Sequence, residues 1–161
     1  MLFNKKEAKI LVVDDDKALA DNLVDYLSNL GYSTSVTYSG REGLKRFEQG
    51  GFQLVITDLK MPEMDGMEFL DEVKKLDSRA IVMVITGYVT IESAVKAFKK
   101  GAYDFIPKPF KMEELEVIVK RALERHTPIR QLGIFRGLTL DLIISVPFLL
   151  ILGIVLALVW K

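Results

Sequence analysis

Short apolar runs alternate with longer amphipathic stretches through residues 1–126 of this 161-residue chain. The apolar runs are 9–13, 32–38, 53–57, 80–86 and 103–107. Three of them are rich in Val, Ile and Leu without polar alternation, which is typical of strands buried on both faces. Five strand–helix units of similar length predict an α/β fold, with a parallel sheet and helices on both of its faces.

The stretches between the runs have the periodicity of amphipathic helices. In residues 17–31, Leu19, Leu23 and Leu27 share one face, and Gly31 is a suitable helix terminator. The other predicted helices occupy 40–50, 65–77, 90–101 and 111–126.

Polar residues follow the predicted strands at the point where each strand ends. Asp14 and Asp15 follow the first strand, Asp58 the third, Thr86 closes the fourth and Lys108 follows the fifth. In an open parallel sheet, functional side chains gather beyond the carboxyl ends of the strands. Clustered carboxylates repel one another, and a divalent cation relieves that repulsion. Because only oxygen ligands are present, we expect a hard ion such as Mg²⁺.

This set of groups suits a dianionic phosphoryl group. The metal and the Lys108 ammonium would neutralise the phosphoryl oxygens, and the Thr86 hydroxyl would donate one hydrogen bond. A carboxylate oxygen would then attack phosphorus and form an acyl phosphate. The strand ends therefore predict phosphoryl transfer to an aspartate.

Four motifs stand at the spacing of one known family: "ILVVDDD", "LVITDLKMPEMDG", "VMVITG" and "GAYDFIPKPF". Residues 8–125 thereby resemble a response-regulator receiver domain of two-component signalling. The resemblance implies a flavodoxin-like (βα)5 doubly wound sheet with strand order 2-1-3-4-5.

The resemblance also implies roles for the acids. Asp58 corresponds to the phosphoacceptor and contributes to the metal site. Asp15 corresponds to the direct metal ligand, and Asp14 to the acid that holds metal-bound water. The backbone carbonyl of Lys60 corresponds to the third protein ligand.

Three further positions take their roles from the same resemblance. Thr86 corresponds to the switch hydroxyl and Lys108 to the lysine that binds the phosphoryl group. Phe105 corresponds to the aromatic side chain that turns inward on activation. A cis peptide bond is expected at Lys108–Pro109.

Lys60 and Tyr88 follow Asp58 and Thr86 by two residues each. For Lys60, the simpler interpretation is a side chain in solvent. A sharper hypothesis is that the Lys60 ammonium and the Tyr88 ring shield the phosphoryl group from water.

The composition changes after Arg125. Residues 127–140 are predicted to be a linker, and 141–161 a transmembrane helix that serves as a tail anchor behind a domain at 1–126. Residues 142–160 carry no charge, and as a helix they would span about 28 Å, close to the hydrocarbon thickness of a bilayer. A core helix is the alternative, but five other predicted helices already cover both faces of the sheet.

Charge around the apolar run predicts its orientation. Arg125, Arg130 and Arg136 precede it and only Lys161 follows, so the positive-inside rule places the domain in the cytoplasm. Small residues at four-residue spacing, such as Gly153 and Ala157, allow the hypothesis of a homodimer through this segment.

The composition excludes several classes of site. The chain has no cysteine, so disulfides, thiolate catalysis and cysteine-ligated metals are ruled out. Its formal net charge is zero, without the basic excess that nucleic-acid binding usually requires, so no nucleic-acid partner is expected.

The expected function is a membrane-anchored receiver that accepts a phosphoryl group on Asp58 and switches a protein-interaction surface. Its partners would be a sensor histidine kinase or phosphotransfer protein and an unknown output protein. It would not be an enzyme beyond catalysing its own phosphorylation and dephosphorylation. Two alternatives stay open: a phosphorelay intermediate or phosphate sink, and a non-signalling membrane scaffold.

Overall fold

Five strands and five helices alternate along residues 8–125, the part of the chain that the computed structural model describes. The strands are β1 (Lys9–Val13), β2 (Ser33–Thr37), β3 (Leu54–Thr57), β4 (Ile81–Thr86) and β5 (Asp104–Pro107). The helices are α1 (Lys17–Asn29), α2 (Gly40–Gly50), α3 (Gly66–Leu76), α4 (Ile91–Lys99) and α5 (Met112–Arg125).

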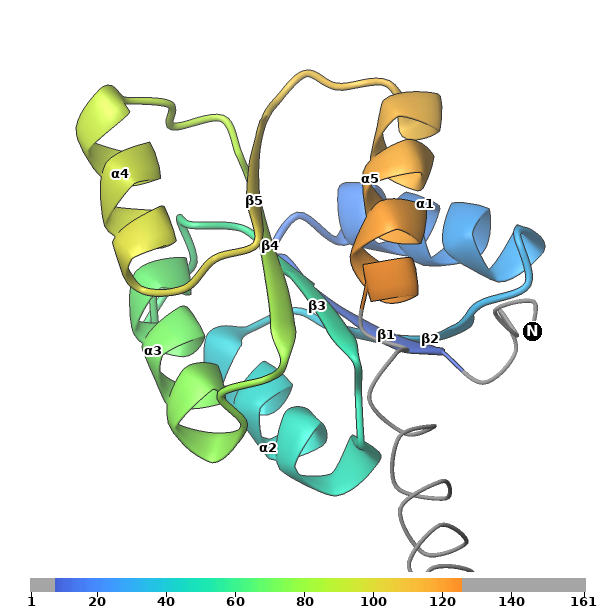
Figure 1. Cartoon of the computed structure of the whole chain (residues 1–161), viewed down its shortest axis with the longest axis horizontal. Helices are drawn as coiled ribbons and strands as arrows, with labels where there is room; N and C mark the ends of the chain where they lie inside the picture. Colours follow the sequence, from blue (N-terminus) through green and yellow to red (C-terminus); the bar gives the residue numbers. More distant parts are fainter. Residues whose placement is uncertain (1–7, 126–161) are drawn as a thin grey trace, which may run out of the picture. The chain divides into compact units, whose positions relative to one another are not determined.

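The strands form one parallel sheet in the order β2-β1-β3-β4-β5 (Figure 1). This order and the alternation of strands and helices confirm the flavodoxin-like fold predicted from the sequence. β1, β3 and β4 form the centre of the sheet and are buried almost throughout, as their uninterrupted apolar runs predict. β2 and β5 lie at the edges and are only partly buried.

Alternate residues of the central strands pack into two separate hydrophobic cores, one on each face of the sheet. Ile10 and Val12 of β1 pack in the core under α1 and α5, whereas Leu11 and Val13 pack in the core under α2, α3 and α4. Figure 1 shows the corresponding layers, with α1 and α5 on one face of the sheet and the other three helices on the opposite face. The period-2 geometry of a strand therefore divides each apolar run between two cores.

Side-chain caps fix where the helices begin. Asp16 accepts a hydrogen bond from the Leu19 N–H at the start of α1, and Asp65 accepts two at the start of α3. Thr90 and Ser93 form a reciprocal capping box at the start of α4. Such caps each contribute about 0.5–2 kcal/mol, and they hold the strand-to-helix loops that carry the polar strand ends.

The sheet thereby brings the carboxyl ends of its strands to one edge. The connections from β4 to α4 and from β5 to α5 lie at the same end of the sheet in Figure 1. The Lys108–Pro109 peptide bond at this edge is cis, as expected.

Within residues 8–125, none of the helices is sufficiently long and apolar to cross a bilayer. The predicted linker at 127–140 and the predicted transmembrane helix at 141–161 lie outside the described residues.

Candidate functional site

Asp14 and Asp58 lie side by side because their strands are paired in register. Val13 of β1 is opposite Thr57 of β3, so the next residue of each strand is an aspartate at the carboxyl edge. The Asp58 N–H donates to the Val13 carbonyl at 3.1 Å and holds this alignment. Asp14 is only 2% exposed and Asp58 only 8% exposed, whereas Asp15 is exposed.

Three carboxylates of this edge fit a hard divalent cation. Asp14, Asp15 and Asp58 each offer a carboxylate oxygen, and these oxygens lie within 4.8 Å of one another. An all-oxygen set with two buried carboxylates is the donor type that Mg²⁺ prefers. Lys60 is exposed directly beyond β3, and the ligand role of its backbone carbonyl stays a prediction.

Lys108 joins the two buried acids. Its Nζ lies 2.8 Å from Asp14 Oδ2 and 3.3 Å from Asp58 Oδ2. Its backbone N–H donates to the Thr86 carbonyl at 2.8 Å, which extends the β4–β5 pairing and aims the residue at the acids. The predicted lysine therefore stands beside the predicted phosphoacceptor.

Backbone amides orient both carboxylates. The Leu59 N–H donates to Asp58 Oδ1 at 2.6 Å, and the Asp16 N–H donates to Asp14 Oδ1 at 2.9 Å. In each acid, Oδ1 is held by the backbone and Oδ2 faces the Lys108 ammonium.

Burial and ion pairing shift the pKa values of Asp14 and Lys108 in opposite directions. Burial raises the pKa of Asp14 above its usual value, although hydrogen bonds from Lys108 and Asp16 lower it. Burial alone would lower the pKa of Lys108, but its contacts with Asp14 and Asp58 outweigh this and raise it. The Lys108 side chain therefore stays protonated and presents a positive charge to a phosphoryl group at the site.

Thr86 is completely buried at the end of β4. Its Oγ1 accepts a hydrogen bond from the Tyr88 N–H at 3.1 Å. Within the described part of the chain, no hydrogen bond joins this hydroxyl to Asp58. The structure thus places Thr86 at the carboxyl end of β4, where its side chain is hydrogen-bonded to its own loop.

Phe105 is half-buried on β5, opposite Val84 of β4. It packs against the core under α2, α3 and α4. The inward turn expected on activation is not tested by this arrangement.

The side chains of Lys60 and Tyr88 meet across the edge of the site. Lys60 Nζ lies 5.4 Å from the centroid of the Tyr88 ring, within the range of a cation–π interaction. Tyr88 is 63% exposed, so the pair lies at the surface of the domain. The shielding hypothesis stays a prediction.

Gly66 is a position that the sequence reasoning missed. A Cβ at Gly66 would stand 2.0 Å from the Asp58 carbonyl oxygen. The Gly66 N–H donates to the Leu59 carbonyl at 2.9 Å, so α3 begins directly against the loop that carries the acceptor. The Asp-Gly pair in "MPEMDG" was the available signal, since such pairs mark tight turns.

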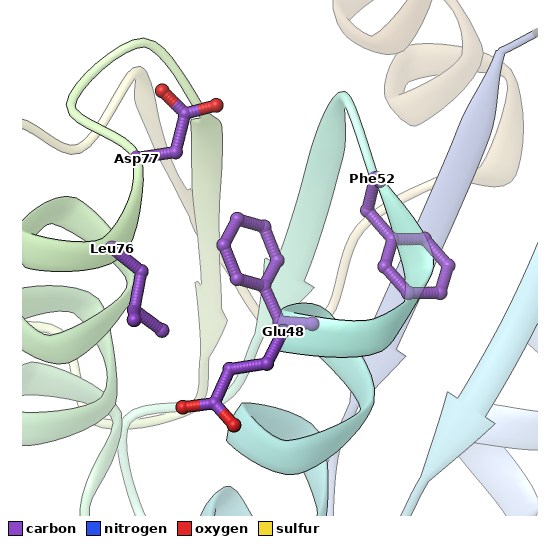
Figure 2. Close-up of a pocket in the computed structure, with 6 residues that line it drawn as sticks. Glu48, Phe52, Leu76 and Asp77 are labelled. Carbon is purple, nitrogen blue, oxygen red and sulfur yellow. The ribbon is translucent and has the colours of Figure 1, made fainter.

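A separate open hollow of about 380 Å³ lies at the other edge of the sheet, where β3 begins. Figure 2 shows Leu76 and Asp77 of the α3 end across from Glu48 and Phe52. None of the predicted site residues lines it.

The sequence matches the family described as "Response regulator receiver domain" over residues 10–120. It is similar to the "Transcriptional regulatory protein ZraR" of Escherichia coli O157:H7, with 39% identity over 120 residues. That match covers 74% of this chain and only 27% of the regulator.

Two solved structures are similar to the fold. One is a CheY-like response regulator receiver domain protein from Methanospirillum hungatei JF-1, with 33% identity and a TM-score of 0.72. The match covers 74% of this chain and 95% of that chain. The matched fold is therefore nearly the whole of that solved chain. The other is the beryllofluoride-activated NtrC4 receiver domain dimer, with 36% identity, a TM-score of 0.70, and coverage of 74% and 98%.

Proposed function

Because the chain belongs to the response regulator receiver domain family, we propose that it accepts a phosphoryl group on Asp58 in a Mg²⁺-dependent reaction. The observation that carries this proposal is the convergence of Asp58 with Asp14, Asp15 and Lys108 at one edge of the sheet. No other cluster of three or more His, Cys, Asp or Glu side chains within residues 8–125 has comparable metal-binding geometry.

The donor in this proposal is a phosphohistidine on a sensor kinase or phosphotransfer protein. An Asp58 carboxylate oxygen attacks phosphorus, a P–O bond forms and the P–N bond breaks. The imidazole leaves with the bonding electrons and takes a proton from solvent. Bound Mg²⁺ would supply neutralisation of the phosphoryl charge, and Asp14, Asp15 and Asp58 would hold it.

Lys108 binds the incoming phosphoryl group in this reaction. Its ammonium already lies beside Asp58 Oδ2, so charge neutralisation requires little movement. The chain catalyses only its own phosphorylation and dephosphorylation, and it acts otherwise as a switch.

Thr86 is the group through which the switch is proposed to act. When its hydroxyl turns to the phosphoryl oxygens, it gives up the hydrogen bond from the Tyr88 N–H that now holds the loop before α4. Phe105 turns inward in the same state and reshapes the surface of α4, β5 and α5 for an output protein. Phosphorylation shifts the population between two arrangements of one fold.

The proposed location is the cytoplasmic face of a membrane, with residues 141–161 as a single transmembrane anchor. The support is the uncharged run of 142–160 and the arginines that precede it. Resistance of the full chain to carbonate extraction tests the anchor, and release on deleting 141–161 is the expected result. Extraction of the intact chain would remove this part of the proposal.

The absence of a nucleic-acid partner stays a prediction. The relative ZraR is named as a transcriptional regulatory protein, and the match covers about a quarter of its length. Gel-shift titration of the full chain with unrelated duplex DNA, at low and moderate salt, tests this prediction. Saturable binding that weakens with salt would contradict it.

The primary experiment is phosphorylation of the detergent-solubilised full chain with a small-molecule phosphodonor, with and without Mg²⁺. We expect a base-labile adduct that requires Mg²⁺ and is absent from Asp58→Asn. Asp25→Asn, which removes an exposed carboxylate on α1, is the matched control and should be modified normally. Unmodified wild-type protein with an intact fold would overturn the proposal.

A further inference from the structure

Exposed apolar side chains are concentrated in one segment of residues 8–125. Five of the seven large hydrophobic residues that are exposed there belong to α4 and the loop before it. They are Tyr88, Val89, Ile91, Val95 and Phe98. The remaining two, Leu76 and Val117, lie singly on α3 and α5.

On α4 the apolar residues form a continuous ridge. Ile91, Val95 and Phe98 follow the i, i+4, i+7 spacing that places side chains along one face of a helix. They are 82%, 45% and 50% exposed, while Ala97 on the inner face is completely buried. α4 is therefore held to the domain by its small residues and presents its large ones outward.

Basic residues flank this ridge. Lys96 and Lys99 are exposed, and neither takes part in an ion pair within the described part of the chain. Lys100, in contrast, is paired with Asp71 of α3. Glu92 is the one acidic residue of α4, so the outer face of the helix combines apolar side chains with a net positive charge.

We propose that the outer face of α4 binds the surface of a membrane that contains anionic lipids. Ile91, Val95 and Phe98 would enter the boundary between headgroups and acyl chains, while Lys96 and Lys99 would meet the lipid phosphates. This is the chemistry of an interfacial amphipathic helix, whose apolar face enters the bilayer and whose basic residues attract anionic headgroups.

Two observations favour a lipid surface over a protein groove. The ridge is built of exposed side chains on the outside of a helix, and a deformable lipid interface accepts it without a complementary cavity. The unpaired lysines also match a surface of dense negative charge. A receiver domain of this size offers few such contacts, so its intrinsic affinity is expected to be low.

Binding of α4 to lipid does not require the proposed transmembrane anchor. The proposed membrane location matters only for how strongly the full chain would show this binding. An anchor would keep α4 near the bilayer and raise its effective concentration there. The contact itself belongs to residues 1–126, which form a compact unit and correspond to receiver domains solved almost alone. The two ideas are therefore testable separately.

The test uses the absence of cysteine from the chain. Val95→Cys is labelled with an environment-sensitive fluorophore, in residues 1–126 and in the full chain. Vesicles of phosphatidylcholine alone are compared with vesicles that also contain phosphatidylglycerol. Leu76→Cys is the matched control, because Leu76 is 49% exposed and lies at the end of α3.

We expect a blue shift of the Val95→Cys label only with the anionic vesicles, and no shift of the Leu76→Cys label. Lys96→Gln combined with Lys99→Gln should lower vesicle partitioning on the order of tenfold or more, since each lysine near such a surface contributes favourably. Exchanging the exposed Lys45 and Lys120 for glutamine should change it far less.

Three results would overturn the proposal. The first is no response of the Val95→Cys label to anionic vesicles. The second is an equal response of the Val95→Cys and Leu76→Cys labels. The third is a shift of the Val95→Cys label with protein concentration in the absence of lipid. The last result would identify a second copy of the chain as the occupant. Failure of the anchor would appear instead as carbonate extraction of the full chain, with the vesicle response of residues 1–126 unchanged.

Discussion

At the scale of single residues, the chemistry of the site depends on how each polar atom is held. Asp58 Oδ1 accepts the Leu59 N–H, which leaves Oδ2 facing the Lys108 ammonium at 3.3 Å. Asp14 uses the same arrangement, with Oδ1 on the backbone and Oδ2 on Lys108. Two buried carboxylates are thereby kept close together by one shared cation.

The contact between Lys60 and Tyr88 gives a prediction about the lifetime of the acyl phosphate. Lys60→Ala or Tyr88→Ala should shorten it by about two- to fivefold, the size expected from loss of one exposed cation–π contact that restrains the shield. The measurement is the decay of labelled phosphoprotein after removal of the donor.

Lys45→Ala is the control for this series, because it removes an exposed lysine from α2. Equal lifetimes for the wild type, both shield variants and the control would end the shielding hypothesis.

The raised pKa of Asp14 predicts how stability depends on pH. A group whose pKa is higher in the folded state favours folding at low pH, and this contribution is lost as pH rises through the folded pKa. Asp14→Asn should therefore increase the free energy of unfolding of the metal-free protein at pH 7. The gain should shrink as the pH falls towards about 4, where the unfolded aspartate also takes up its proton.

Urea unfolding at several pH values, without divalent cations, measures this difference. Asp25→Asn, which removes an exposed carboxylate from α1, is the control for the loss of one acidic side chain. A difference between Asp14→Asn and wild type that grows at low pH would contradict the burial argument.

At the scale of elements, the start of α3 limits what the acceptor loop tolerates. Gly66 opens the helix directly behind Asp65, its N-cap, and leaves no room for a side chain against the Asp58 backbone. Because the obstacle is backbone and not a flexible side chain, relief requires the loop or the helix to move.

Gly66→Ala should lower the free energy of unfolding by about 1–3 kcal/mol, the usual cost of overpacking, and should displace Asp58 enough to slow phosphorylation. Thermal unfolding and the phosphorylation rate measure the two effects. Gly87→Ala is the matched control, since a Cβ there meets nothing within 4 Å. Equal stability of the two variants would show that the loop adjusts freely.

At the scale of the whole molecule, residues 1–126 form a compact unit with its own paired cores. These cores bury apolar side chains of all five helices and of the central strands. The protein made as residues 1–126 should therefore unfold within a few degrees of the corresponding transition in the full chain and be phosphorylated at a similar rate.

Calorimetry of the two proteins, with the full chain in detergent, checks this expectation. A large loss of stability or of phosphorylation in residues 1–126 would show that the C-terminal segment supports the fold. Asp58→Asn in both proteins separates loss of folding from loss of the acceptor.

The sequence alone determined the element order, the burial of three central strands and the identity of the polar strand ends. Apolar runs without alternation require burial on both faces, and side chains at the carboxyl ends of parallel strands must share an edge. Asp16 and Asp65 were also predictable as caps, because a short acid before an amphipathic stretch satisfies free N–H groups.

Only the tertiary structure decided how these groups are paired. Strand register and side-chain direction decide three contacts that the sequence does not specify. Lys108 bridges Asp14 and Asp58. Thr86 accepts the Tyr88 N–H, and Gly66 lies against the Asp58 carbonyl. The outward direction of the apolar ridge on α4 was also decided only by the tertiary structure. In the sequence, the spacing of its large apolar residues is typical of a helix face that packs into a core. Which face of that helix met the sheet was settled by the close packing of Ala97, a contact that periodicity does not specify.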